Sequence, residues 1–268
     1  MIKTCASSLF LAILGSAALG ESKLPADLVQ ATILPGWRTA DGTHMAALKL
    51  ELSPGWKTYW RAPGEAGIPP EFDWTGSQNV AGVRLHWPRP VVFDTNGMQT
   101  LGYHDVLVLP VEIALKDADQ PLHLAVNADL GVCRDICVPA QVHVTADLAP
   151  DGKGDAAIRA ALADQPLPAR KLGLSNAVCA VEPIADGLRV TASLTMPALG
   201  KGETVVLESG APGVWVSQAM SLREGGTLRA TADMVGNSGQ PFALNREDVR
   251  ITVLAGDRAV ETWGCQGG

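Results

Sequence analysis

The chain has 268 residues, of which 18% are charged and 47% are hydrophobic, and its formal net charge is −7. This length fits one large or two medium domains, and the apolar fraction excludes an intrinsically disordered chain. The balance of 21 basic against 28 acidic residues argues against nucleic-acid binding, which needs a concentrated basic face. We therefore expect a globular protein without a nucleic-acid partner.

The first segment, residues 1–20, has the pattern of an export signal. Lys3 supplies a positive start, residues 9–14 form a short apolar core, and Ala18-Leu19-Gly20 fits a small-x-small cleavage site. The apolar run is too short to span a bilayer, and no later segment approaches about 20 continuous apolar residues. We expect cleavage near Gly20 and a mature protein in an oxidising compartment, most simply the periplasm.

Short strand patterns dominate residues 21–148. Residues 44–52 and 124–130 alternate between apolar and polar side chains, and residues 106–115 form another apolar strand. Turn residues such as Ser53-Pro54-Gly55 separate these segments. Because no long helices alternate with the strands, the pattern predicts a β-sandwich and not a parallel sheet.

Tryptophan is concentrated in the first third of the chain, where five of the seven lie between Trp37 and Trp87. Trp56, Tyr59 and Trp60 follow a predicted strand, on a segment rich in proline and glycine. Aromatic side chains on such an irregular loop can form a docking surface for a partner. The alternative is a hydrophobic plug over one end of the sandwich, and both interpretations stay open at this point.

Cys133 and Cys137 lie between two strand patterns, so we expect them to flank a three-residue hairpin loop. Cysteines directly opposite on antiparallel strands have Cα atoms about 4.5–5.5 Å apart, which a disulfide accepts. Arg134 favours a thiolate and Asp135 opposes it, so no strong activation of either thiol is expected. A permanent structural disulfide and an exchangeable disulfide are both compatible with this spacing.

The strand pattern breaks at residues 149–172, which combine a linker rich in proline and glycine with a short alanine-rich helix over residues 155–164. Strand signals return in residues 173–268, for example over residues 188–194. The whole pattern predicts an all-β chain of two β-sandwich domains that are joined by a short helical linker.

Removal of the signal leaves four cysteines, which allow three pairings: Cys133, Cys137, Cys179 and Cys265. In the loop-entropy model, a bond between Cys179 and Cys265 closes about 87 residues and stabilises by roughly 4.6 kcal/mol, against about 2 kcal/mol for the close pair. Tight rings are also easier to reduce. We therefore interpret Cys179–Cys265 as a structural disulfide and the close pair as the candidate for redox chemistry.

Metal chemistry at the close pair is a further alternative. A zinc site is less expected, because two thiols need two further ligands and no second Cys-x-x-Cys is near. A copper(I) site that adds Met98 or His104 to the thiols stays open, since soft ligands suit that ion. Motifs for a serine nucleophile, a P-loop or a dinucleotide are absent, so we expect no cofactor and no resident metal.

Three segments together resemble a known family. Residues 133–139 and 103–111 resemble the amino-terminal periplasmic domain of the thiol:disulfide interchange protein DsbD. Residues 55–64, together with residues 68–70, are similar to its ScsB-type branch, which is named for suppression of copper sensitivity. The resemblance in sequence motifs covers roughly residues 30–146. Over the second domain, only the arrangement of the chain resembles that of ScsB ectodomains.

The resemblance implies an immunoglobulin-like sandwich whose cysteine pair relays electrons between periplasmic thioredoxin-fold proteins and a membrane-embedded partner. Cys133 and Cys137 match the family's redox pair, and the family position implies that Cys137 attacks while Cys133 resolves. The family's cap loop, which shields the disulfide, falls on Phe93, Asp94, Asn96 and Met98. Partner docking is assigned to the aromatic residues Trp56, Tyr59, Trp60 and Tyr103.

The family comparison also shows two departures. The three-residue spacing between the cysteines is shorter than in the best-known DsbD domain. The membrane and thioredoxin-like modules of full-length members have no counterpart in these residues, so a separate membrane protein is expected to deliver electrons. The leading hypothesis is a periplasmic thiol–disulfide oxidoreductase. The alternatives are a non-catalytic binding module with structural disulfides and a copper-binding or copper-tolerance protein.

Overall fold

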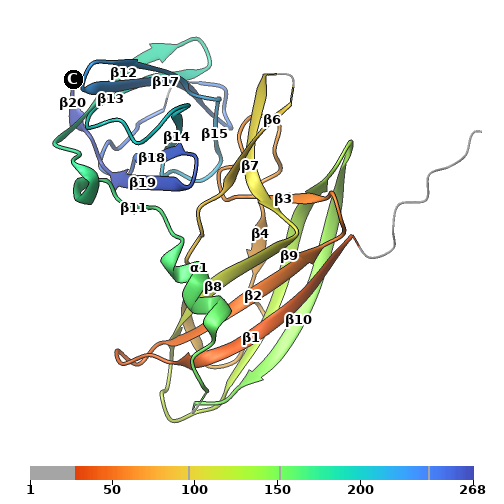
Figure 1. Ribbon diagram of the computed structural model, residues 1–268. Coiled ribbons are helices and arrows are strands. Elements are labelled where there is room, and N and C mark those ends of the chain that lie inside the picture. The colour runs from red at the N-terminus through yellow and green to blue at the C-terminus, as the bar shows by residue number, and fades with distance from the viewer. Residues whose placement is uncertain (1–27, 96, 151, 241) are drawn as a thin grey trace, which may run out of the picture.

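The computed structural model describes residues 28–95, 97–150, 152–240 and 242–268, so the predicted signal peptide lies outside the described residues (Figure 1). Strands dominate the described part of the chain, and its one α-helix lies between two groups of strands. The prediction of an all-β, immunoglobulin-like chain is confirmed. Each group of strands forms a sandwich of two sheets. We call the group before the helix the first sandwich and the group after it the second sandwich.

The first sandwich, residues 29–148, consists of two antiparallel sheets. One sheet has the order β1 (Val29–Arg38), β2 (His44–Leu52), β8 (Val106–Leu115) and β5 (Val80–Leu85). The other, which we call the cysteine sheet, has the order β10 (Cys137–Leu148), β9 (Leu122–Cys133), β3 (Lys57–Tyr59), β7 (Met98–His104) and β6 (Val91–Thr95). The short β4 (Glu71–Asp73) pairs with β9 away from this path. The edge position of β10 later determines which sulfur is accessible.

The predicted alternation on β2 is present, and it places the core. Leu48 and Leu50 are each 1% exposed and face the core, while Glu51 points to solvent. Met45 and Ala47, on the opposite face of β2, are also buried. This second buried face departs from simple alternation because a helix covers it.

That helix is α1 (Ala156–Ala163), in the segment between the sandwiches, and it runs along the first sandwich (Figure 1). The Asp155 carboxylate caps its start by accepting hydrogen bonds from the amides of Ala157 and Ile158. Ile158 is fully buried against Met45 and packs in the same cluster as Ala47. The linker is therefore attached to the first sandwich by apolar packing.

The second sandwich, residues 167–267, again has two sheets. The first has the order β11 (Leu167–Pro168), β19 (Arg258–Trp263), β18 (Arg250–Ala255) and β14 (Thr204–Glu208). A 3-10 turn, η1 (Ala169–Leu172), follows β11. The other has the order β15 (Val214–Val216), β17 (Thr227–Gly236), β13 (Gly187–Thr195), β12 (Asn176–Ile184) and β20 (Gln266–Gly267), and β16 (Met220–Glu224) pairs with β17.

A disulfide joins Cys179 on β12 to Cys265, which directly precedes β20, and their Cα atoms are 5.6 Å apart. The bonded residues are 86 positions apart in the chain. Cys179 has no exposed surface, and β12 also pairs with β20. The bond therefore connects the start of the second sandwich to its end inside a packed region.

Candidate functional site

The close cysteine pair lies at one tip of the cysteine sheet. Cys133 ends β9 and Cys137 begins β10, and the two residues are direct partners in the strand register. Their sulfurs are bonded, and their Cα atoms are 4.1 Å apart. The three-residue loop between them is exposed, which confirms the predicted hairpin.

The two sulfurs have different surroundings. Cys133 is only 2% exposed, because β9 is an interior strand and Lys57 of β3 pairs with it on the side away from β10. Cys137 is exposed, because β10 forms the edge of the sheet. An incoming thiolate can therefore approach the sulfur of Cys137, while the sulfur of Cys133 is covered.

Tyr59 is the polar neighbour of both sulfurs. Its hydroxyl donates a hydrogen bond to Cys133 Sγ at 2.9 Å and lies 3.2 Å from Cys137 Sγ. The side chain is 2% exposed, and this burial raises the pKa of Tyr59 above its ordinary value of 10.0. The hydroxyl therefore keeps its proton at neutral pH and stays a hydrogen-bond donor to the sulfurs.

A glycine and a loop side chain hold the Tyr59 ring in place. A Cβ atom added to Gly131 would lie 3.0 Å from Tyr59 Cδ2 and 2.7 Å from Cβ of Ile68. Gly131 thus leaves space that the tyrosine ring and the isoleucine fill. Ile68 belongs to residues 60–70, a segment without helix or strand that follows β3, and we call it the covering loop.

A lysine lies on the same face of the sheet, next to the disulfide. Lys57 pairs with Cys133 on one side and with His104 on the other, so all three side chains share one face. Lys57 Nζ lies 4.6 Å from the ring centroid of Phe93 and 3.2 Å from Thr100 Oγ1. Burial lowers the pKa of the Lys57 ammonium. These contacts direct the ammonium group toward β7 and β6, on the side of β3 away from Cys133.

The predicted cap loop lies on the β6–β7 hairpin, at the far end of the cysteine sheet from β10. Phe93 contacts Lys57 and His104, Asp94 accepts a hydrogen bond from the Gly97 amide, and Met98 is 52% exposed. Asn96 lies outside the described residues. In the sheet, β3 and β7 separate β6 from Cys133, so shielding of the sulfurs by this hairpin stays a prediction.

The prediction that four aromatic residues form an exposed docking surface is wrong. Trp56 and Tyr59 are each 2% exposed, Trp60 is 0% and Tyr103 is 7% exposed. Trp56, Trp60 and Tyr103 pack into the core between the sheets, and Tyr103 donates a hydrogen bond to the Pro88 carbonyl at 2.7 Å. They fit the alternative interpretation, a hydrophobic plug. Burial of their apolar surface stabilises the fold even where the backbone is irregular.

The sequence interpretation missed Lys57, Ile68 and Gly131 as neighbours of the disulfide. Lys57 and Tyr59 are two residues apart on a strand, and this spacing already indicates a shared face. Nothing local indicated that Gly131 lies opposite Tyr59, because the pairing of β3 with β9 joins distant parts of the chain.

Within the described part of the chain, no group of three or more His, Cys, Asp or Glu side chains could hold a metal ion. His104, a ligand in the copper(I) alternative, is exposed and forms a hydrogen bond with Asp105 at 2.5 Å. Across the same residues, no helix has the length and apolar character needed to cross a membrane.

Comparison with known proteins agrees with this geometry. Residues 30–149 match the family model described as thiol:disulfide interchange protein DsbD, N-terminal. The structure is similar to the crystal structure of the N-terminal periplasmic domain of ScsB from Proteus mirabilis, with a TM-score of 0.67 and 26% sequence identity. That match covers 90% of this chain and 94% of the ScsB domain, so it includes the second sandwich. No curated protein sequence matches significantly. The resemblance found in the sequence is confirmed.

Proposed function

With residues 30–149 matching the amino-terminal domain of DsbD, we propose that this protein exchanges thiols and disulfides through Cys133 and Cys137. The observation that carries the proposal is the asymmetry of one bond, in which Cys137 is exposed and Cys133 is 2% exposed. Exchange requires that one residue of the pair be accessible, and the exposed Cys137 meets this requirement.

The exchange begins when a partner thiolate attacks Cys137 Sγ. The new bond joins the partner sulfur to Cys137, the Cys133–Cys137 bond breaks, and its electron pair leaves on Cys133 Sγ. The second thiolate of the partner then attacks the partner sulfur in this mixed disulfide and releases Cys137 as a thiolate. The partner dithiol has become a disulfide, and the cysteine pair has taken up two electrons. The reverse sequence starts with attack by Cys137 on a partner disulfide.

Tyr59 stabilises the leaving sulfur in this step. Its hydroxyl already donates to Cys133 Sγ at 2.9 Å, and hydrogen bonds to charged groups are stronger than those to neutral ones. This hydrogen bond favours the thiolate form of Cys133.

The proposal extends to location and partners. The matched relative is described as a periplasmic domain, and we propose export of this chain to the periplasm, with thioredoxin-fold proteins as exchange partners. A membrane-embedded protein would deliver the electrons. The exposed Cys137 sits on a protruding hairpin, which suits the active-site surface of a thioredoxin-fold protein, where a reactive thiol is accessible.

Single-cysteine variants test the proposal. Each variant is mixed with a single-cysteine thioredoxin whose thiol carries a thionitrobenzoate leaving group. Cys133→Ser leaves Cys137 free, and we expect a covalent complex and coloured thionitrobenzoate. Cys137→Ser leaves the covered Cys133, and we expect a rate at least about tenfold lower, because attack depends on access.

The double variant Cys133→Ser, Cys137→Ser is the control, and it should release no thionitrobenzoate. Equal rates for the two single variants, or no complex with either, would contradict the proposal. The second outcome would favour the alternative of a binding module with structural disulfides.

A further inference from the structure

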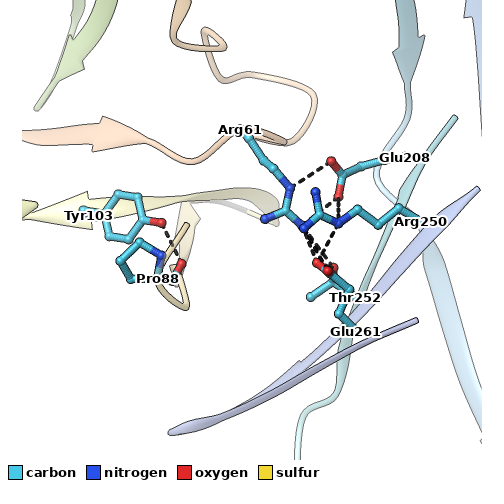
Figure 2. Close-up of polar contacts among 7 residues, drawn as sticks. All are labelled: Arg61, Pro88, Tyr103, Glu208, Arg250, Thr252 and Glu261. Atoms are coloured by element: carbon cyan, nitrogen blue, oxygen red, sulfur yellow. Dashed lines mark hydrogen bonds and ion pairs between the residues drawn. The ribbon is translucent and has the colours of Figure 1, made fainter. Parts of the chain in front are cut away.

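One contact between the second sandwich and the covering loop is made by Arg61. Arg61, two residues after β3, donates from Nε to Glu208 Oε1 and from Nη2 to Glu208 Oε2, each at 3.0 Å (Figure 2). Its Nη2 also lies 2.7 Å from Glu261 Oε2. Arg250 of β18 donates to the other oxygen of Glu261 at 2.8 Å. We call these four residues the clamp.

The clamp is partly buried and balanced in charge. Its members contribute two positive and two negative charges, and the Arg61 side chain is 11% exposed. Arg61 is the one member that comes from the first sandwich. Its guanidinium carbon also lies 3.8 Å from the ring centroid of Trp60, which is fully buried in the first core. A bidentate carboxylate and an aromatic face together define one orientation of this side chain.

A second set of contacts supports the same loop. The Gln218 amide donates to Glu65 Oε1 at 3.0 Å, and Gln218 Oε1 accepts from the Gln99 amide at 3.1 Å. Glu65 belongs to the covering loop and Gln99 to β7, so one residue of the second sandwich holds both segments. A cavity of about 630 Å³, lined by residues of both sandwiches, adjoins the clamp. Apolar packing also joins the two sandwiches, because Leu254 and Ala259 of the second are buried in the core cluster of the first.

The covering loop leads from the clamp to the disulfide. It begins beside Arg61 and includes Ile68, which packs with Tyr59 over Gly131. Tyr59 in turn contacts the covered sulfur of Cys133. Between Arg61 and Ile68 the loop is also held to β7, where the Leu101 amide donates to the Pro63 carbonyl at 3.0 Å. Arg61 and this bond together fix the path of the loop toward Ile68.

We propose that Arg61 is a positioning residue through which the second sandwich holds the covering loop against Tyr59 and so restricts exchange to Cys137. This inference rests on the proposed function of the cysteine pair. It gives the second sandwich a role, which is to define which sulfur reacts and not to react itself.

The test measures the reactivity of Cys133 alone. In the Cys137→Ser background, Arg61→Met removes the guanidinium and keeps an unbranched apolar stem that can lie on Trp60. We expect the reaction of the Cys133 thiol with 5,5′-dithiobis(2-nitrobenzoate) to become on the order of tenfold faster, because local opening exposes the sulfur. Arg61→Lys should give an intermediate rate, since lysine keeps the charge without the bidentate geometry.

Two further variants complete the experiment. Arg189→Met removes an exposed bidentate pair with Asp233 in the second sandwich and should leave the Cys133 rate unchanged. Glu208→Gln weakens the clamp from the other side and should raise the rate in the same direction as Arg61→Met. It also keeps the test informative if Arg61→Met fails to fold.

An unchanged Cys133 rate in Arg61→Met and Glu208→Gln, with cooperative unfolding preserved, would overturn the inference. An equal increase in Arg189→Met would overturn it too, because the effect would then be a general loss of stability. The proposed function is judged separately, by complex formation through Cys137 in a chain with an intact clamp. Either idea can therefore fail without the other.

Discussion

At the scale of single residues, the site depends on how two sulfurs in one bond differ. Cys137 is exposed at a sheet edge, while Cys133 is covered and accepts a hydrogen bond from the Tyr59 hydroxyl. Attack on the accessible sulfur therefore makes the stabilised sulfur the leaving group. A thiolate is a better leaving group when a donor already points at it, because no reorganisation is needed as the charge develops.

Tyr59→Phe removes that donor and keeps the ring. We expect reduction of Cys133–Cys137 by dithiothreitol to slow about tenfold, since a hydrogen bond to a charged group contributes roughly 1.5–3 kcal/mol. Burial raises the pKa of Tyr59 above 10.0, so its hydroxyl keeps its proton and the ratio of the two rates should stay constant between about pH 7 and 9. Stopped-flow tryptophan fluorescence measures both rates.

Tyr103→Phe is the matched control for this variant. Tyr103 is also a buried tyrosine, and its hydroxyl donates to the Pro88 carbonyl. Its loss should lower the free energy of unfolding by about 1 kcal/mol and leave the exchange rate unchanged. A Tyr59→Phe variant that exchanges as fast as the parent would exclude a role for the hydroxyl.

At the scale of elements, the short strand β3 organises the site. It pairs with β9 on one side and β7 on the other, so Lys57 and Tyr59 fall on the same face as the disulfide. The loop that follows β3 folds back over this face and brings Ile68 against Gly131. A strand of three residues thus positions the hydrogen-bond donor to the disulfide and, through the loop that follows it, the side chain that packs over that donor.

Gly131→Ala tests this packing. The added Cβ would lie 2.7 Å from Cβ of Ile68, so Ile68 must move and the cover over Tyr59 must loosen. We expect the free energy of unfolding to fall by about 1–3 kcal/mol, as for other overpacked sites. We also expect faster reaction of the Cys133 thiol in the Cys137→Ser background. Urea unfolding and thiol kinetics measure the two effects.

Gly82→Ala supplies the comparison for this substitution. Gly82 lies in β5, and no heavy atom lies within 4 Å of an added Cβ. The free energy of unfolding of the Gly82→Ala variant should stay within about 0.5 kcal/mol of that of the parent protein. An equally small change in the free energy of unfolding for Gly131→Ala would mean that Ile68 moves aside at little cost and does not hold Tyr59 in place.

At the scale of the whole molecule, two disulfides serve different purposes. Cys179–Cys265 joins residues 86 apart, and Cys179 is fully buried. Cys133–Cys137 joins residues four apart at an exposed tip. In the chain-entropy model, the longer loop is the more stabilising one. The molecule thus combines a largely covered bond that ties one sandwich together with an accessible bond on the other.

Titration of the oxidised protein with dithiothreitol should open Cys133–Cys137 well before Cys179–Cys265. The reason is access, because Cys137 is exposed, whereas Cys179 has no exposed surface and Cys265 is partly buried. Alkylation of the free thiols at each step, followed by peptide mass spectrometry, identifies the order. Simultaneous opening of both bonds would contradict this assignment.

Much of the architecture could be predicted from local pattern. Alternation at Leu48 and Leu50 placed a strand and its core face, and the spacing of Cys133 and Cys137 placed a hairpin. The aromatic cluster around Trp60 was interpreted in part as an exposed docking surface, although it is buried. Proline and glycine in that segment indicate an irregular backbone, and they carry no information about what covers it.

The amino-acid sequence by itself determined the alternating strands, the break between the two groups of strands and the hairpin that places Cys133 opposite Cys137, because these depend on residues close together in the chain. Only the tertiary structure decided which sulfur is accessible and what holds its cover. Tyr59 reaches Cys133 across 74 positions, and Arg61 reaches Glu208 across 147. Such contacts follow from strand order and from the packing of one sandwich on the other, which no local pattern encodes.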